Sequence, residues 1–146
     1  MHKAKQYCLD FLFAMALLSP LAVMAADQRA DIRLAADQRE VVLTEMRGFL
    51  SAVQQITDAL ARQDMKAAAV AARSVGSVAT HDMPVSLKQA LPLEFKQLGF
   101  SVHHDFDQLA MDAESIGDVR HSMTQMSRIL QKCVACHATY QLNVKP

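Results

Sequence analysis

The sequence predicts an all-α fold with four helical segments, and three observations support this prediction. From Ala26 onward the chain is rich in Ala, Gln, Leu, Met, Arg and Glu, which are good helix formers. Gly and Pro are few, and Gly76, Pro84 and Gly117 stand at plausible breaks between segments. Apolar residues recur three and four positions apart, and we find no strand signal, internal repeat or low-complexity stretch.

The first helix is expected from about Asp31 to Arg62. The apolar positions on one side of it step by four and three residues, which predicts a buried stripe: Val42, Met46, Phe49, Val53, Ile56 and Leu60. The stretch from Ala26 to Arg39 is more polar, and we interpret it as a frayed or projecting N-terminal extension.

The second and third helices are separated by a loop at His81–Pro84. Asp64 is a good N-cap for a second helix that covers the alanine-rich Met65–Val75, and Gly76 is placed to end that helix. The third helix is expected from about Leu91 to Ala113. Its inward stripe is formed by Leu91, Phe95, Leu98, Val102, Phe106 and Leu109.

The fourth helix is expected to begin after Asp118, which again is a suitable N-cap. Its apolar stripe also steps by four and three residues: Val119, Met123, Met126, Leu130, Cys133, His137 and Tyr140. Two cysteines and a histidine therefore lie in register with the positions that we expect to face the core.

These residues form a Cys-x-x-Cys-His motif, with Cys133 and Cys136 three positions apart and His137 directly after them. This is the attachment sequence for a c-type haem, in which each thiol bonds one vinyl group and the imidazole ligates the iron. On a helix, Cys133, Cys136, His137 and Tyr140 share one face, along which a flat macrocycle can lie. The sequence therefore predicts one covalently bound haem c on the inward face of the last helix.

Two alternatives to haem remain open for this motif, a redox dithiol and half of a zinc site. A thioredoxin-like dithiol needs a preceding strand and a βαβ context. A tetrahedral zinc site needs separated ligand pairs, for which the adjacent Cys136 and His137 are poorly suited. Both alternatives are therefore weaker than the haem interpretation.

The N-terminal residues 1–25 resemble a secretory signal peptide. His2, Lys3 and Lys5 precede a short apolar run, and Val23-Met24-Ala25 forms a small-residue cleavage site. Cleavage after Ala25 removes Cys8, so the mature domain, residues 26–146, keeps only the two cysteines of the motif. Because haem is attached covalently to exported chains, we expect a bacterial periplasmic protein with no membrane span after cleavage.

The charge balance excludes one class of partner. The chain has 15 basic and 15 acidic residues and no basic patch, so nucleic-acid binding is not expected. No constellation of serine, cysteine and carboxylate side chains suggests hydrolysis, and we expect a protein that is not an enzyme.

The position of the motif on the last helix of an exported helical chain resembles the class II cytochromes c, the family of cytochrome c prime and its low-spin relatives. The matching residues are Cys133, Cys136, His137 and the aromatic Tyr140 after the motif. The resemblance implies an antiparallel four-helix bundle with the haem in its core. It also implies His137 as the proximal iron ligand, and dimers that pair through the first two helices.

In this family the first helix covers the distal side of the haem, so the resemblance makes Met46 the candidate sixth ligand. A methionine there gives a low-spin electron carrier with a raised reduction potential. The alternative is that Met46 is a plain core residue. Phe49 and Tyr140 are expected to line the haem pocket.

Two further histidines, His103 and His104, lie on the third helix. We interpret them as boundary or surface residues, with iron ligation or a hydrogen bond near a haem propionate as the alternative. The favoured function is periplasmic electron transfer to a partner redox protein through a short-lived contact. The second is a five-coordinate haem that binds NO or CO, and a zinc-stabilised helical adaptor is a distant third.

Overall fold

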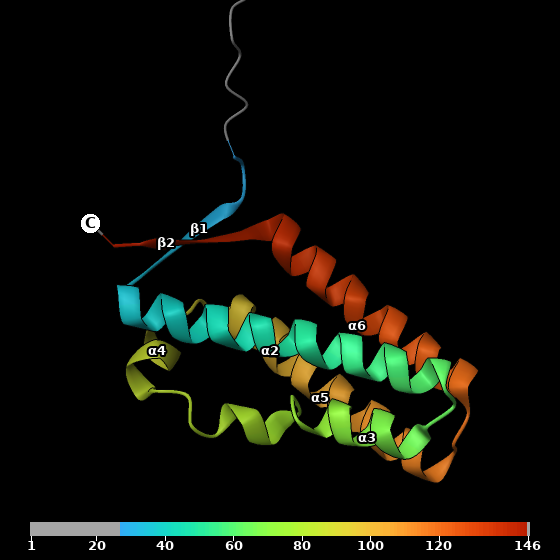
Figure 1. The fold of residues 1–146 in the computed structure, drawn as a ribbon. Helices are drawn as coiled ribbons and strands as arrows, with labels where there is room; N and C mark the ends of the chain where they lie inside the picture. The colour runs from blue at the N-terminus through green and yellow to red at the C-terminus, as the bar shows by residue number, and fades with distance from the viewer. Residues whose placement is uncertain (1–26, 146) are drawn as a thin grey trace, which may run out of the picture.

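The computed structural model describes residues 27–145. The chain is mostly helical, and its helices pack against one another around a shared core (Figure 1). The elements are β1 (Ala30–Leu34), α2 (Ala36–Ala61), α3 (Met65–Arg73), the 3₁₀ helix η1 (Ser77–Thr80), α4 (Val85–Ala90), α5 (Leu93–Ser115), α6 (Val119–Thr139) and β2 (Tyr140–Val144). The four predicted helices are thus present as α2, α3, α5 and α6, but the expected start of the first at Asp31 is wrong, because that residue lies in β1. Within residues 27–145, no helix is long and apolar enough to cross a membrane. The predicted signal peptide lies outside the described residues.

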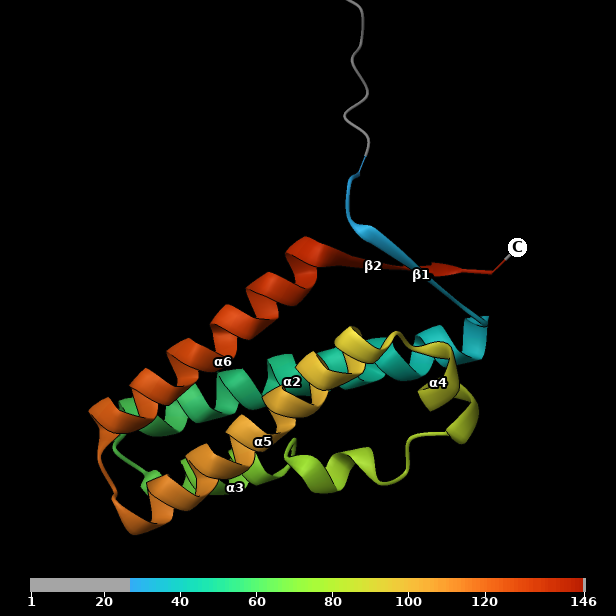
Figure 2. The same ribbon diagram turned by 180° about the vertical axis from the view of Figure 1, so that it is seen from behind.

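Helix packing leaves α2 and α6 only loosely associated. The short α3 packs against both α2 and α5, and α6 packs mainly on α5. Figures 1 and 2 show α6 diverging from α2 toward its C-terminal end. The main core is formed by apolar residues from these four helices, among them Ile56, Ala69, Phe106, Leu109 and Ile129. Small alanines on α3, such as Ala68, Ala69 and Ala72, are fully buried and allow the neighbouring helices to approach closely.

The helix starts follow the capping signals in the sequence. The Asp64 carboxylate accepts a 2.9 Å hydrogen bond from the backbone N–H of Ala67, and Asp118 accepts a 2.7 Å bond from His121 N–H. Both contacts satisfy donors that a first helical turn leaves without an intrahelical partner. The two predicted N-caps are therefore confirmed.

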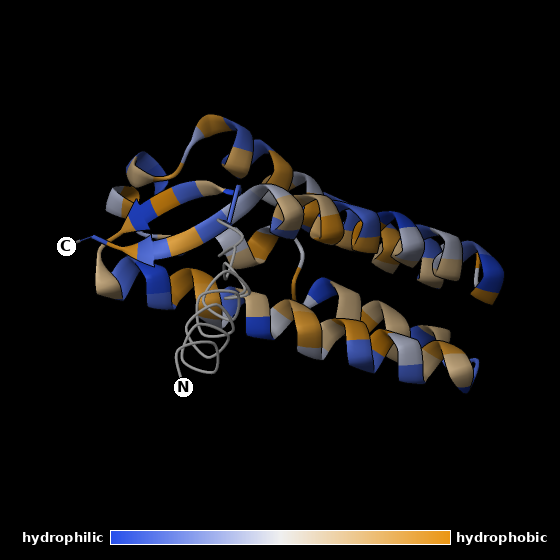
Figure 3. Cartoon of the chain, turned by 90° about the horizontal axis from the view of Figure 1, so that it is seen from above, coloured by the Kyte–Doolittle hydropathy of each residue, from blue (hydrophilic) through white to orange (hydrophobic). Residues whose placement is uncertain are grey.

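A two-stranded parallel sheet corrects the expectation that no strand is present. β1 pairs with β2 in a register that joins Ala30 to Tyr140 and Leu34 to Val144, and the two strands lie side by side in Figure 3. The stretch interpreted as a frayed extension is therefore ordered as β1 and the first turn of α2. Ile32 and Leu34 are buried on one side of β1, while Asp31 and Arg33 are exposed.

A second, smaller core lies beneath this sheet. It consists of Ile32, Leu34, Val42, Leu87 and Leu91, with Met46, Phe95, Tyr140 and Leu142 packed against it. The short α4, which the sequence analysis did not predict, supplies Leu87 to this core. Pro92 is the N-cap of α5, which therefore begins two residues after the expected Leu91.

The predicted stripe on the last helix is wrong at four positions. Met123 and Leu130 are 46% and 42% exposed, His137 is exposed as well, and Tyr140 belongs to β2. The buried side of α6 instead carries Ser122, Met126 and Ile129, and it continues into the half-buried Cys133 and Cys136. The polar Ser122 interrupts the apolar pattern of this side, so hydrophobic periodicity alone favoured the neighbouring one.

Candidate functional site

A cavity of about 290 Å³ lies between the N-terminal half of α2, the C-terminal end of α6 and β2. This volume is at the lower end of about 300 to 1,000 Å³, the range typical of small-molecule sites. Its lining residues are Arg29, Arg39, Val42, Leu43, Met46, Phe95, Cys136, His137, Tyr140, Gln141, Leu142 and Asn143. Four of the residues predicted for the haem site, Met46, Cys136, His137 and Tyr140, therefore share one cavity.

The two cysteines lie on the inward side of the last turns of α6. Both thiols are free and half-buried, and Cys133 packs against the main core. Burial raises the pKa of the Cys133 thiol. Burial, followed by the neighbouring Cys133, raises the pKa of Cys136. Reactive dithiols require the opposite shift, because the thiolate is the nucleophile. These two thiols are therefore protonated at neutral pH.

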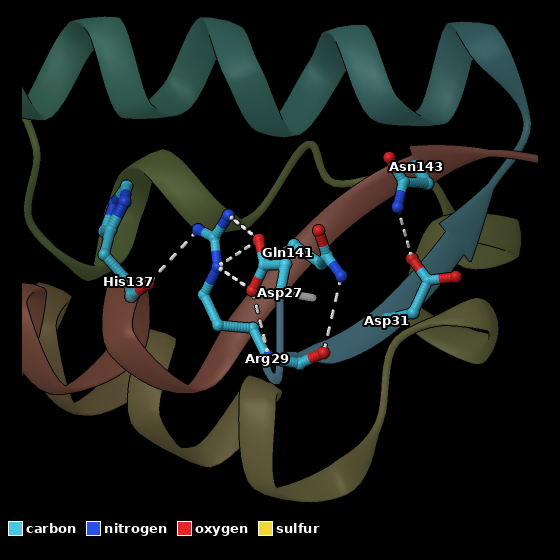
Figure 4. A network of polar contacts seen from close by, with 6 residues as sticks. All are labelled: Asp27, Arg29, Asp31, His137, Gln141 and Asn143. Atoms are coloured by element: carbon cyan, nitrogen blue, oxygen red, sulfur yellow. Dashed lines mark hydrogen bonds and ion pairs between the residues drawn. The ribbon is translucent and has the colours of Figure 1, made fainter. Parts of the chain in front are cut away.

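His137 is the last histidine of α6 and sits two residues before the helix ends. Its side chain is exposed at the cavity, while its backbone oxygen accepts a 3.3 Å hydrogen bond from Nη1 of Arg29. In Figure 4 the imidazole points away from the Arg29 guanidinium, which contacts only the backbone of this residue. Arg29 therefore contacts neither ring nitrogen of His137.

Met46 lines this cavity from α2, whereas His137 lines it from α6. It is half-buried and packs against both hydrophobic cores. Val42 and Leu43 lie beside it on the cavity wall. The structure therefore gives Met46 both a packing role and access to the cavity.

The predicted pocket aromatics separate into two groups. Tyr140 lines the cavity and makes an edge-on contact with Phe95, with ring centroids 5.5 Å apart. Phe49 does not line the cavity. It lies in the main core, stacked 5.6 Å from Phe106.

His103 and His104 do not line the cavity either. The interpretation of His103 as a boundary or surface residue is wrong, because its side chain is only 3% exposed. Its Nδ1 lies 2.8 Å from the backbone oxygen of Val75, and its Nε2 lies 3.2 Å from the Glu45 carboxylate. Burial opposes the charged ring, but these acceptors outweigh burial and raise the pKa of His103. His104 is exposed, as expected for a surface residue.

Sequence reasoning missed two arginines at the site, Arg29 and Arg39. Both line the cavity, and Nε of Arg39 donates a 3.0 Å hydrogen bond to the backbone oxygen of Leu142. Neither residue lies near the motif in the sequence, so no local pattern could have identified them. The parallel pairing of the chain ends brings Arg29 to the site.

The residues around this cavity are of the types that could hold a haem c. The cavity is lined by the Cys136 thiol and His137 from α6, by the Met46 thioether from α2, and by the guanidinium groups of Arg29 and Arg39. Cys133, three residues before Cys136 on α6, does not line the cavity and packs against the main core. Among residues 27–145, no group of three or more His, Cys, Asp or Glu side chains is placed to hold a metal ion. The chain matches no protein-family model, no curated protein and no solved structure.

Proposed function

We propose that this chain is a periplasmic c-type cytochrome that transfers electrons. The observation that supports the proposal most strongly is that Met46 and His137, on helices far apart in the sequence, line the same cavity as Cys136. His137 would be the proximal ligand and Met46 the distal ligand. A haem bound there would supply a reversible one-electron couple at its iron.

The residues of α6 would hold the group covalently. Each thiol of Cys133 and Cys136 would add across one vinyl group, with sulfur bonding one vinyl carbon and the thiol proton going to the other. This addition needs thiols that are not joined in a disulfide, and both cysteines are free in the structure. The His137 imidazole, directly after Cys136, would offer a ring nitrogen to the iron.

The walls of the cavity would control the redox properties. Val42, Leu43, Phe95 and Leu142 limit the water near the site. A thioether ligand from Met46 raises a reduction potential relative to a second histidine. In this proposal the chain is an antiparallel four-helix bundle that carries haem on its last helix, as its resemblance to the class II cytochromes c implies.

The test uses the exported, full-length chain. We expect haem that stays attached after denaturation in the unaltered protein and is lost in the double variant Cys133→Ala/Cys136→Ala. We expect the unaltered protein to give a low-spin ferrous spectrum that does not change when CO is added. We expect Met46→Leu to give a high-spin ferrous spectrum that changes when CO binds. Met126→Leu is the matched control, because Met126 is buried in the main core away from the cavity. A purified protein without covalent haem would contradict the proposal, and its zinc content would then test the adaptor alternative.

A second function, binding of NO or CO by a five-coordinate haem, is favoured by one observation. Met46 packs against both hydrophobic cores, which is sufficient reason for a methionine at this position. In that case the unaltered protein already gives a high-spin spectrum and binds CO. Met46→Leu then leaves both properties unchanged.

A further inference from the structure

The C-terminal end of α6 is tied to a segment that precedes it by more than one hundred residues. We call residues 27–34 the N-terminal strap. Within it, the Asp27 carboxylate accepts 3.0 Å hydrogen bonds from the backbone N–H and from Nε of Arg29. The Arg29 guanidinium lowers the pKa of Asp27 to about 2, so this carboxylate is charged at any physiological pH. Asp27 thereby holds the guanidinium in a fixed orientation.

In that orientation Nη1 of Arg29, which makes none of these bonds to Asp27, contacts the C-terminal end of α6. Nη1 donates a 3.3 Å hydrogen bond to the backbone oxygen of His137, 108 residues away (Figure 4). The last carbonyl groups of a helix have no intrahelical donor, and the C-terminal end carries partial negative charge. Tyr140 N–H bonds the carbonyl of Cys136. Arg29 therefore acts as a C-cap for the next carbonyl, supplied from another part of the chain.

Further contacts bind the strap to the residues that follow His137. The Gln141 amide donates to the backbone oxygen of Arg29 over 3.4 Å, and Asn143 donates to Asp31 over 2.7 Å (Figure 4). Lys145 N–H donates to the backbone oxygen of Leu34 over 2.8 Å. Ile32 and Leu34 anchor the strap in the second core. The strap is thus anchored in the second core by Ile32 and Leu34, and it hydrogen-bonds to the end of α6 and to β2.

We propose that the N-terminal strap is a positioning element for the haem-binding turn, and that Arg29 is its key positioning residue. By capping the His137 carbonyl, Arg29 fixes the turn that carries Cys136 and His137 and presents the imidazole to the cavity in one orientation. The cap itself follows from the contacts of the strap. Its effect on an iron–imidazole bond rests on the proposed function.

The first test measures backbone amide exchange in the full-length chain produced without haem. In Arg29→Ala, exchange of the amides of residues 137–144 is expected to be about three- to tenfold faster, because the loss of one hydrogen bond loosens this turn. Arg33→Ala is the matched control. Arg33 lies on the same strand and pairs with Asp31, but it does not line the cavity or contact α6. Equal exchange in both variants would overturn the inference.

The second test measures the iron–imidazole stretching vibration in the ferrous, haem-loaded Met46→Leu protein, with and without Arg29→Ala. We expect a shifted and broadened band with Arg29→Ala and an unchanged band with Arg33→Ala. Faster exchange with an unchanged band would limit Arg29 to a purely structural role and overturn its positioning of the imidazole. A chain without covalent haem would contradict the proposed function alone, since the exchange measurement would still decide whether Arg29 fixes the turn.

Discussion

The buried imidazole of His103 on α5 lies 3.2 Å from the carboxylate of Glu45 on α2. Its other ring nitrogen faces the backbone oxygen of Val75, which can only accept a hydrogen bond. A protonated ring can donate from both nitrogens, one to Val75 and one to Glu45. Phe49 packs against it, with centroids 4.9 Å apart, and a charged His103 helps to lower the pKa of Asp107. This ring therefore connects α2, α5 and the segment that follows α3.

This arrangement predicts that the protein loses stability as the pH rises above 6.5. The folded state raises the pKa of His103 above its ordinary value of 6.5. Its contribution to stability is therefore complete below that value and is lost as the pH rises through the folded pKa. The free energy of unfolding, measured with urea across this range, is expected to fall. His103→Gln should flatten this part of the profile. A fall that persists in His103→Gln would contradict the assignment.

Gly76 is required by a close approach of Asp107. A Cβ at this position would overlap the Asp107 carboxylate, which accepts a 2.9 Å hydrogen bond from Ser77 N–H. Gly76→Ala is expected to cost about 1 to 3 kcal/mol, since the carboxylate must move and leave that donor unpaired. Gly99→Ala is the control, because no atom lies within 4 Å of a Cβ there. In the interior of α5 this change should stabilise by up to about 1 kcal/mol. Thermal unfolding distinguishes the two results.

Ser122 is a buried polar residue whose hydroxyl has no hydrogen-bond partner among the described residues. Its side chain is 1% exposed on the inward side of α6. Removing an unpaired buried hydroxyl should be neutral or stabilising, so Ser122→Ala is expected to raise the free energy of unfolding by about 0 to 2 kcal/mol. A clear loss of stability in urea unfolding would show that the hydroxyl has a partner. Thr124→Ala provides a comparison, because Thr124 is exposed on the same helix.

Met46→Leu should change the spectrum far more than the stability. Leucine has nearly the volume of methionine, and such exchanges in packed sites usually cost less than about 1.5 kcal/mol. We therefore expect the haem-free variant to unfold at nearly the same urea concentration as the unaltered chain. Met46→Ala removes apolar contacts with both cores and should cost more than Met46→Leu. A large loss in Met46→Leu would mean that a spectral change in this variant reports unfolding rather than ligand loss.

The helices and the motif follow from local information in the sequence. Asp64 and Asp118 begin α3 and α6 because a short acceptor side chain satisfies the first N–H groups of a helix. The spacing of Cys133, Cys136 and His137 places these residues on neighbouring positions of α6 whatever the rest of the chain does. The haem, its spin state and the export of the protein stay predictions.

The wrong predictions about secondary structure share one cause, which is contact between residues that are distant in the sequence. Ile32 and Leu34 form a strand only because Leu142 and its neighbours pair with them from the other end of the chain. Tyr140 leaves the helix for the same reason. Apolar periodicity also could not choose between two adjacent sides of α6, because the buried Ser122 is polar and the exposed Met123 is apolar.

The sequence by itself determined that α2, α3, α5 and α6 form, and that Cys133, Cys136 and His137 lie close together on the last of them, because capping and helical spacing act within a few positions. Only the tertiary structure decided what surrounds those residues. It places Met46 at the cavity, Phe49 and His103 in the core, and Arg29 on the carbonyl of His137. The physical reason is that packing and parallel strand pairing join residues about one hundred positions apart, and no local pattern encodes such partners.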